Sequence, residues 1–405
     1  MPADLSPGSP VIAAGRYDET FPTAFGSARV VAHASQLDDA DWTRALDGAS
    51  KDIRYYRLCE KTLPQANFTY RYLLLRDHAG YARALQPLFF TDQDLTAGLS
   101  TNMRRPIAAL RRVYPGFLSL KMLMVGCTAG EGHLGVFDPR DTAAVDGLLD
   151  ALQTYGQRQG AGIITFKDFP SAFRTMLDAP AIRQGFVRMP SFPATIIKLA
   201  GYANAEDYFN RRLGKAMRKN LRRKFRDDPA RPPVTLEVRH DVSDAVDELH
   251  PLYLQVLARS SFRFEELTKE YFRELGRTMG DRARFFVWRQ EGRAVAVSLT
   301  MVHDGVFYDN YLGLDYSVAL DRHLYFVTIR DEIDWAISQG LHTYYSTPLN
   351  YDPKLHLRFA LEPLDLYVRH TSAWMNPFFK RIAPLLEPTR YDKLLRRFEN
   401  YADLA

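Results

Sequence analysis

Residues 306–348 constrain the fold more than any other part of this chain of 405 residues. Val306–Leu312 is rich in aromatic and branched residues, which predicts a β-strand. Apolar residues then recur at three- and four-residue steps over Leu324–Ser338, and this spacing predicts a helix that ends at Gly340. A second strand is expected over Leu341–Ser346. This order of strand, loop, helix and strand predicts a βαβ unit with two parallel strands.

An earlier segment of the chain has the same order. Phe117–Val125 predicts a buried strand, Asp141–Gly156 has an apolar face at helical spacing, and Ile163–Phe166 predicts the next strand. Between the first strand and the helix lies a glycine-rich loop, Gly126–Gly135. We interpret the two segments as a weak internal repeat. Ligands of such units usually lie beyond the carboxyl ends of the parallel strands, which is where we look for a site.

The overall composition fits a globular protein and excludes several classes. Hydrophobic residues make up 46% of the chain and charged residues 25%, and the net charge is +5, so an anionic partner is allowed but not required. Two cysteines exclude a disulfide scaffold. The sequence has no secretory signal and no apolar run of about eighteen residues, so we expect a cytoplasmic protein. Peripheral contact with the inner face of a membrane stays open.

The segment Arg211–Arg226 carries the strongest local charge. It contains nine basic residues, and no acidic residue occurs between Asp207 and Asp227. Like charges four residues apart destabilise a helix by about 0.2–0.5 kcal/mol per pair, so the cluster indicates either acidic neighbours elsewhere in the fold or an anionic ligand. Cofactor phosphates, tRNA and anionic lipid headgroups all remain candidates for that ligand.

A set of residues in the second half of the chain forms a pattern known from one family. The set consists of Asp309, Tyr311, Gly313, Ala336-Ile337, Gly340-Leu341, Lys354, Phe359 and His370. With the basic segment before it, this pattern resembles the FemAB-like branch of the GNAT acyltransferases, over about residues 202–370. The resemblance implies an N-acyltransferase and does not name a substrate.

The same resemblance implies an α+β fold of two tandem GNAT-like units, with mixed β-sheets flanked by helices. We expect the first unit over residues 28–200 and the second over residues 201–375. A mobile tail is predicted for residues 1–27, which are rich in proline, glycine, serine and alanine. An amphipathic helical segment is predicted for residues 376–405.

Transfer of an acyl group to an amine requires removal of an amine proton, donors to the carbonyl oxygen and a proton for the leaving group. Asp309 is the candidate for binding and deprotonating the amine. Tyr311 is the candidate proton donor to the leaving group, a role that the resemblance implies. His323, at the start of the predicted helix, is the third catalytic candidate. Asn310 is expected to point to the other face of the strand, because side chains alternate there.

The remaining candidates are binding residues. Arg218, Lys219 and Arg222 are predicted to bind the phosphates of a cofactor. The predicted substrate-binding residues are Lys354, Tyr345, Glu131 and His133; Lys354 would hold a substrate anion, and Glu131 and His133 lie in the glycine-rich loop, where an acid/base pair is one interpretation. No metal-binding, Walker A, Gly-x-Ser-x-Gly or DNA-reading motif is present, so neither a metal nor DNA is predicted.

The acyl donor is expected to be acyl-CoA or an acyl carrier protein, acting as a co-substrate and not as a tightly bound cofactor. The loop Leu314–Arg322 contains no glycine and so departs from the cofactor loop of the GNAT family, which leaves another acyl carrier open. The predicted acceptor is an amine of a cell-envelope compound or lipid, such as a sphingoid base in a bacterial ceramide synthase-like reaction. Two alternatives remain: an aminoacyl-tRNA-dependent transferase of the FemX type, and a non-catalytic GNAT module that binds nucleic acid or membrane.

Overall fold

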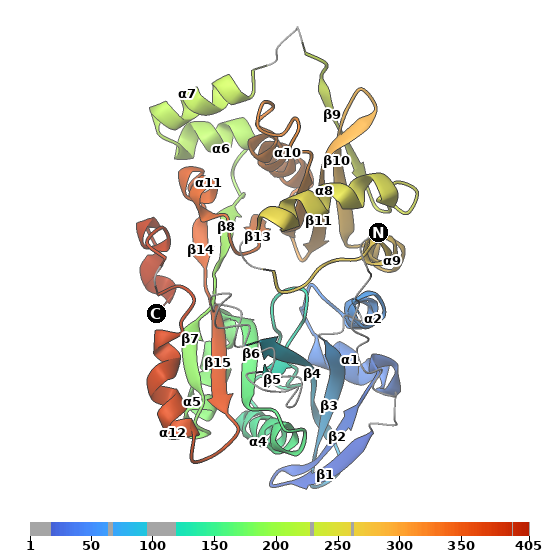
Figure 1. The fold of residues 1–405 in the computed structure, drawn as a ribbon, viewed down its shortest axis with the longest axis vertical. Helices are drawn as coiled ribbons and strands as arrows, with labels where there is room; N and C mark the ends of the chain where they lie inside the picture. The colour runs from blue at the N-terminus through green and yellow to red at the C-terminus, as the bar shows by residue number, and fades with distance from the viewer. Residues whose placement is uncertain are drawn as a thin grey trace, which may run out of the picture.

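The structure, a computed structural model, describes residues 18–63, 68–94, 119–226, 231–260, 263–390 and 392–404 (Figure 1). Its strands form two mixed sheets. The first sheet has the order β1-β2-β3-β4-β5-β6-β15-β7 and the second the order β14-β8-β13-β12-β11-β10-β9. Helices flank both sheets, and the two sheets lie one above the other in the view of Figure 1. The predicted α+β class is therefore confirmed.

The first sheet consists of β1 (Glu19–Thr23), β2 (Gly26–Val31), β3 (Thr69–Asp77), β4 (Ala82–Asp94), β5 (Ser119–Val125), β6 (Ile163–Pro170), β15 (Leu364–His370) and β7 (Val187–Pro190). The helices packed around it are α1 (Asp39–Ala45), α2 (Ile53–Thr62), α4 (Thr142–Arg158) and α5 (Arg174–Arg183). Residues 19–27, which the sequence analysis places in a mobile tail, form β1 and the start of β2, while residues 1–17 lie outside the described part of the chain.

The second sheet consists of β14 (Ala360–Glu362), β8 (Ala194–Lys198), β13 (Thr343–Ser346), β12 (Val306–Leu314), β11 (Arg293–His303), β10 (Ala283–Gln290) and β9 (Val234–Arg239). The helices around it are α6 (Ala205–Arg212), α7 (Lys215–Lys224), α8 (Val246–Arg259), α9 (Lys269–Met279), α10 (Leu324–Ser338) and α11 (Tyr351–His356). The predicted basic segment is thus divided between α6 and α7. The C-terminal segment holds α12 (Asn376–Ile382) and the short 3-10 helices η3 (Ala383–Leu385), η4 (Leu395–Arg397) and η5 (Tyr401–Leu404).

Each sheet contains the parallel pair that the sequence predicts. β5 and β6 are parallel and are connected by α4, and β12 and β13 are parallel and are connected by α10. Gly340 has φ +71°, the left-handed conformation expected just after α10. Gly313 serves packing instead: a Cβ there would lie 2.5 Å from the backbone nitrogen of Tyr253, so α8 can cross β12 only at a glycine.

The two units exchange strands. β8 precedes residue 200 but pairs with β13 in the second sheet, and β15 follows the second unit's other strands but pairs with β6 and β7 in the first sheet. The two units predicted from the sequence meet near residue 200. The hydrogen-bonded sheets do not follow this boundary, because each sheet contains one strand from the other unit. This exchange attaches each unit to the other through backbone hydrogen bonds.

Buried side chains reinforce the attachment. The Asp365 side chain on β15 is fully buried and lies 2.7 Å from Arg174 and 3.1 Å from Arg188, both of which belong to the first unit. The Tyr55 hydroxyl on α2 donates to the Ala129 carbonyl oxygen at 2.7 Å and lies 2.7 Å from the Tyr271 hydroxyl on α9. One continuous core accordingly contains residues of both units.

We expect Asp365→Ala to lower the free energy of unfolding by about 3–5 kcal/mol, because it leaves two arginines without their buried carboxylate. Asp244→Ala is the matched control: Asp244 pairs with Arg239 but is 71% exposed, so its loss should cost at most about 1 kcal/mol. Urea unfolding of both variants measures the difference. Equal costs would show that the Asp365 cluster does not hold β15 in place.

Candidate active site between the two units

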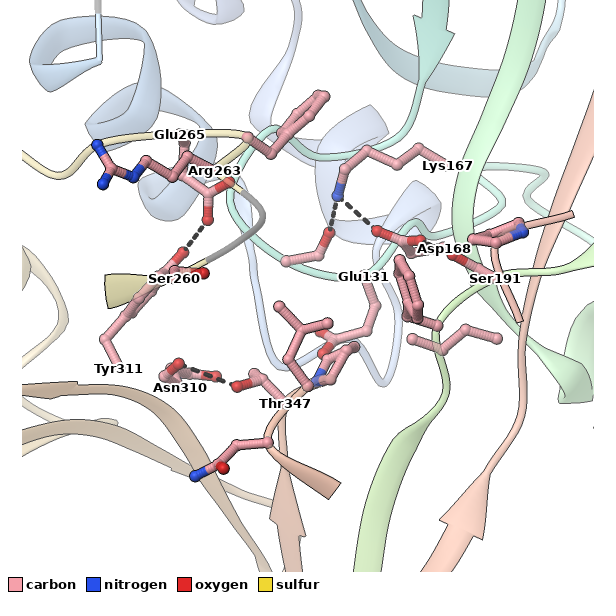
Figure 2. Close-up of a pocket in the computed structure, with 18 of the residues that line it drawn as sticks. Glu131, Lys167, Asp168, Ser191, Ser260, Arg263, Glu265, Asn310, Tyr311 and Thr347 are labelled. Carbon is pink, nitrogen blue, oxygen red and sulfur yellow. Dashed lines mark hydrogen bonds and ion pairs between the residues drawn. The ribbon is translucent and has the colours of Figure 1, made fainter. Parts of the chain in front are cut away.

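A cavity of about 880 Å³ lies between the two units, where the parallel pairs of both sheets end (Figure 2). One part of its wall is apolar and includes Met122, Met124, Ile163, Met189, Leu366 and Val368. Another part is polar and draws side chains from both units, among them Lys167, Asp168, Glu265, Asp309, Tyr311 and Lys354. A cavity of this size that combines apolar walls with a few polar groups is typical of a small-molecule site.

A β-bulge shapes the second unit's side of the cavity. Leu299 on β11 lies opposite Tyr311 and Thr300 lies opposite Asp309, so Asn310 is an extra residue in β12. Asp309, Asn310 and Tyr311 consequently all line the cavity. The expectation that Asn310 points to the other face was wrong, because it assumed the regular alternation that the bulge interrupts.

Asp309 lies at the last residue pair of β12 and β13, where its partner is Ser346. Its carboxylate accepts hydrogen bonds from the Ser346 hydroxyl at 2.8 Å and from the Tyr344 hydroxyl at 3.1 Å. Beyond this pair the parallel ladder ends, and the Thr347 hydroxyl donates to the Asn310 carbonyl oxygen at 3.1 Å (Figure 2). The strands thus separate beside a carboxylate that is held in one orientation.

Tyr311 donates its hydroxyl proton to Glu265 across a distance of 2.7 Å (Figure 2). Burial raises the pKa of Glu265 above its usual value, although Lys167 and the hydrogen bond from Tyr311 act in the opposite direction. Burial, assisted by the charge of Glu265, raises the pKa of Tyr311 as well. The pair therefore combines a phenol that keeps its proton with a carboxylate that binds a proton more readily than an exposed one.

Sequence reasoning missed Glu265. It lies in the connection between α8 and α9, outside any motif, and 46 residues from Tyr311 in the chain. Only the packing of that connection against β12 brings the two side chains together.

The first unit contributes a second polar group. Lys167 lies 2.7 Å from the Asp168 carboxylate and donates to the Gly130 carbonyl oxygen at 3.2 Å, and Ser191 donates to Asp168 at 2.5 Å (Figure 2). Burial alone would lower the pKa of Lys167, but Asp168 and Glu265 outweigh it and the pKa is raised. Lys167 consequently places a positive charge on the wall opposite Tyr311. The strand β6 was predicted, but no role was assigned to these residues.

Lys354 occupies the position expected for it, in the wall of the cavity. Its ammonium is buried and donates to the Thr347 carbonyl oxygen at 2.6 Å. Burial lowers its pKa to about 8, with Asp309 opposing the shift. A substantial fraction of Lys354 is thus neutral slightly above physiological pH.

The other predicted substrate-binding residues lie around a neighbouring cavity of about 340 Å³, lined by Glu131, His133 and Tyr345. Glu131 lines both cavities and forms an ion pair of 2.5 Å with Lys51. Burial would raise the pKa of Glu131, but Lys51 outweighs it and lowers the pKa. Burial lowers the pKa of His133 to about 4, so this histidine is neutral at physiological pH. Glu131 and His133 are two residues apart in the loop but do not form the predicted acid/base pair with each other.

His323 and the predicted phosphate ligands lie outside both cavities. His323 precedes α10 with φ 52°, and burial followed by the charges of Lys224 and Arg223 lowers its pKa. Arg218 and Arg222 bind Asn210 on α6, through its carbonyl oxygen at 2.8 Å and its side chain at 3.2 Å. The helix that carries them, α7, lies at the end of the molecule away from the first sheet (Figure 1). The structure therefore does not bring these residues to Asp309 and Tyr311.

Two cations that line the large cavity were not predicted. Arg259, at the end of α8, lies with its guanidinium 3.7 Å from the centre of the Tyr316 ring, and Arg263 donates to the Ala258 carbonyl oxygen at 2.7 Å. Both side chains are exposed. They place positive charge at the mouth of the cavity.

Comparison with protein families matches residues 215–354 to the Acetyltransferase (GNAT) domain. Among solved structures, FemX is similar over 84% of this chain and 96% of its own, with 11% identity and a TM-score of 0.50. The C-terminal domain of a putative lysylphosphatidylglycerol synthetase from Agrobacterium fabrum is similar over 87% of this chain and 97% of its own, with 15% identity and a TM-score of 0.47. A tandem GNAT protein from the clavulanic acid biosynthesis pathway is similar over 85% and 99%, with 11% identity and a TM-score of 0.49. Comparison with curated proteins gives no match.

The match identifies an acyltransferase domain of the GNAT type at residues 215–354, and the similarity to FemX shows that the chain shares the fold of that protein. This shared fold agrees with the resemblance to the FemAB-like branch that the sequence pattern indicates. No helix in the described ranges has both the length and the apolar character needed to cross a membrane.

Replacing Lys354 with methionine tests the shifted pKa. Because its pKa is about 8 in the folded protein and 10.5 without the fold, the unfolded chain binds more protons between these values, and the stability of the wild type rises with pH there. From pH 7.5 to 9.5 we expect the wild type to gain about 1–2 kcal/mol relative to Lys354→Met. Urea unfolding at several pH values measures this change, and a difference that is independent of pH would contradict the shifted pKa.

Proposed function

We propose that this protein forms an amide between an activated long-chain acyl donor and an amine, in the cavity between its two units. The observation that carries the proposal is the combination of an apolar cavity of about 880 Å³ with the Tyr311–Glu265 pair in its wall. A cavity of this size is larger than an acetyl group requires. The apolar wall suits a hydrocarbon chain, and the polar wall suits the reacting carbonyl group and the amine.

The Tyr311–Glu265 pair supports a proton transfer that needs no external acid or base. The amine nitrogen attacks the acyl carbon, the C–N bond forms, and the bond between the acyl carbon and the leaving sulfur or oxygen breaks. Glu265 takes the amine proton and Tyr311 gives its own proton to the leaving group. Glu265 then returns the amine proton to Tyr311 along their 2.7 Å hydrogen bond. The amine proton is thereby moved to the leaving group and both side chains are restored.

Asp309 and Lys167 have binding roles in this proposal. Asp309, which Ser346 orients, binds the incoming ammonium group and takes its first proton, which passes to solvent, so that the amine attacks in its neutral form and Glu265 takes the second proton. The buried charge of Lys167 on the opposite wall stabilises the negative charge that develops on the carbonyl oxygen. Lys354 holds Thr347 beside the end of β13 and so maintains the gap between the strands.

The donor that we propose is acyl-CoA or the phosphopantetheine arm of an acyl carrier protein, bound as a co-substrate. Arg259 and Arg263 at the mouth of the cavity are the phosphate ligands that this donor requires, in place of Arg218, Lys219 and Arg222. The proposed acceptor is an amine of a lipid or another cell-envelope compound, such as a sphingoid base, and we propose that the enzyme works in the cytoplasm. The non-catalytic hypothesis is not carried further, because the matched domain is that of an acyltransferase.

One observation favours a second donor, aminoacyl-tRNA. Arg212, Lys215, Lys219, Arg222 and Arg223 are exposed, and none of them forms an ion pair with a carboxylate in the described part of the chain. Such a surface suits a nucleic-acid backbone. Thermal-shift measurements with palmitoyl-CoA, acetyl-CoA and bulk tRNA separate the two donors. Stabilisation by palmitoyl-CoA supports the first proposal, and stabilisation by tRNA alone would replace it with the second.

Glu265→Gln and Tyr311→Phe test the proton transfer. Each is expected to lower kcat by about 10²–10⁴, the usual range for loss of a general acid or base. Glu265 must be ionised to act, so wild-type activity should fall as the pH drops through its raised pKa, and this acid limb should be absent from Glu265→Gln. Steady-state rates from pH 5 to 9 measure both effects, with Arg223→Gln on α7 as the control. Full activity of either Glu265→Gln or Tyr311→Phe would exclude the proposed proton transfer.

Leu366→Trp tests whether the apolar wall holds the acyl chain. The larger side chain should fill part of the cavity and lower kcat/KM for a palmitoyl donor by about tenfold or more, while a donor with a short chain is affected little. Competition between donors of different chain lengths measures the selectivity. Equal losses for both donors would place the acyl chain elsewhere.

A further inference from the structure

The C-terminal segment carries a group of exposed apolar side chains. Trp374 is 80% exposed, Phe378 59%, Leu385 51% and Leu386 64%. Phe378 lies on α12 and Leu385 on η3, while Trp374 lies just before α12 and Leu386 just after η3. Four large apolar side chains exposed within thirteen residues indicate an interaction surface.

The opposite side of this segment is anchored to the first sheet. Phe379 and Ala383 are buried against Met189 on β7 and Val368 on β15. The Asn376 side chain donates to the Gly185 carbonyl oxygen at 2.9 Å and accepts from the His370 backbone N–H at 3.0 Å. The exposed apolar side is therefore presented by a fixed element.

The C-terminal segment is also rich in positive charge. Six exposed basic side chains belong to the same segment, and none of them is within ion-pair distance of a carboxylate in the residues that the structure describes: Lys380, Arg381, Arg390, Lys393, Arg396 and Arg397. Of the segment's acidic residues, Glu399 pairs with Arg358 and Glu387 accepts the Thr389 hydroxyl. Exposed aromatic and leucine side chains beside unpaired basic ones are typical of a surface that binds an anionic bilayer.

The surface continues into the cavity. Leu386 is both exposed and part of the cavity wall, and Pro388 and Phe379 line the cavity as well. A hydrocarbon chain that leaves a bilayer at Leu386 would therefore be close to the apolar wall of the cavity. A second copy of this chain would match the apolar side chains but repel the six cations, so the charge favours a membrane.

We propose that Trp374, Phe378, Leu385 and Leu386 insert into the surface of an anionic membrane, and that a lipid substrate enters the cavity from there. The entry of the lipid rests on the proposed function, whereas the docking does not. Basic side chains hold the segment at the headgroups, and the apolar side chains enter the boundary between headgroups and acyl chains.

Vesicle flotation measures the docking directly. The full chain is mixed with vesicles of phosphatidylcholine alone or with about 30% phosphatidylglycerol, and we expect binding to the anionic vesicles only. Lys380→Gln/Arg381→Gln should weaken the partition by about thirtyfold, since each basic residue near the surface contributes about fivefold. Phe378→Ser/Leu385→Ser should weaken it at least tenfold. Tyr81→Ser, which removes an aromatic side chain that is 67% exposed on another part of the first unit, is the matched control and should bind as the wild type does.

Trp374 supplies a second signal. Of the four tryptophans, Trp42 and Trp288 are each 1% exposed and Trp335 is partly buried against the core of the second unit, so the vesicle-dependent change in tryptophan emission should come chiefly from Trp374. We expect the emission to shift to shorter wavelength with anionic vesicles and the shift to be absent from Trp374→Ala. Equal binding by the wild type and Phe378→Ser/Leu385→Ser, or no binding at all, would overturn the docking. A dimer in solution that Phe378→Ser/Leu385→Ser abolishes, without vesicle binding, would assign the surface to a second copy.

The two proposals fail in distinguishable ways. If only the docking is wrong, detergent-dispersed substrates are still acylated and vesicles do not bind. If only the proposed function is wrong, the vesicle results hold while no amide forms with any donor. If both are right, Phe378→Ser/Leu385→Ser should retain activity in detergent and lose it with substrates embedded in vesicles.

Discussion

The exchange of β8 and β15 is the constraint on which the rest of the structure depends. Each strand is a member of the other unit's sheet, so the two sheets cannot rotate freely against each other. Asp365 adds a buried charge cluster to this junction. In this fixed arrangement the parallel pairs of both sheets end at one cavity. Lys167 and Tyr311 lie on opposite walls of that cavity although 144 residues separate them in the chain. Lys167, Asp309 and Tyr311 all lie on strands, so the two sheets set their relative positions, whereas Glu265 comes from the connection between α8 and α9.

Local sequence patterns predicted the main strands and helices well. The strands and helix from Val306 to Ser346 follow from side-chain periodicity, and Gly340 ends α10 because a left-handed residue is required there. Asp309, Tyr311 and Lys354 were predicted as site residues because they lie near the ends of these elements, where ligands of parallel units usually bind, and the structure places all three in the cavity wall. The α+β class and the two βαβ units follow from the same local information.

The rest depends on contacts that no local pattern contains. Glu265 reaches Tyr311 only through the packing of the connection between α8 and α9. The bulge at Asn310 cannot be inferred from alternation, since it depends on the register with β11. The basic residues of α7 looked like cofactor ligands because charge is visible in a sequence, whereas the direction of a helix is not. The cavity cations Arg259 and Arg263 are fewer and less conspicuous, yet the fold places them at the mouth.

The position of β15 also has a consequence for biosynthesis. β7 joins the first sheet only through β15, which lies between β6 and β7. While the ribosome is still making residues 191–363, one edge of β6 is open and β7 has no partner in that sheet, although the chain up to residue 190 is finished. Open strand edges favour pairing with other chains, so the nascent polypeptide passes through a long interval in which it is prone to aggregate. A protein with this exchange is therefore expected to need chaperone protection until its last strand emerges.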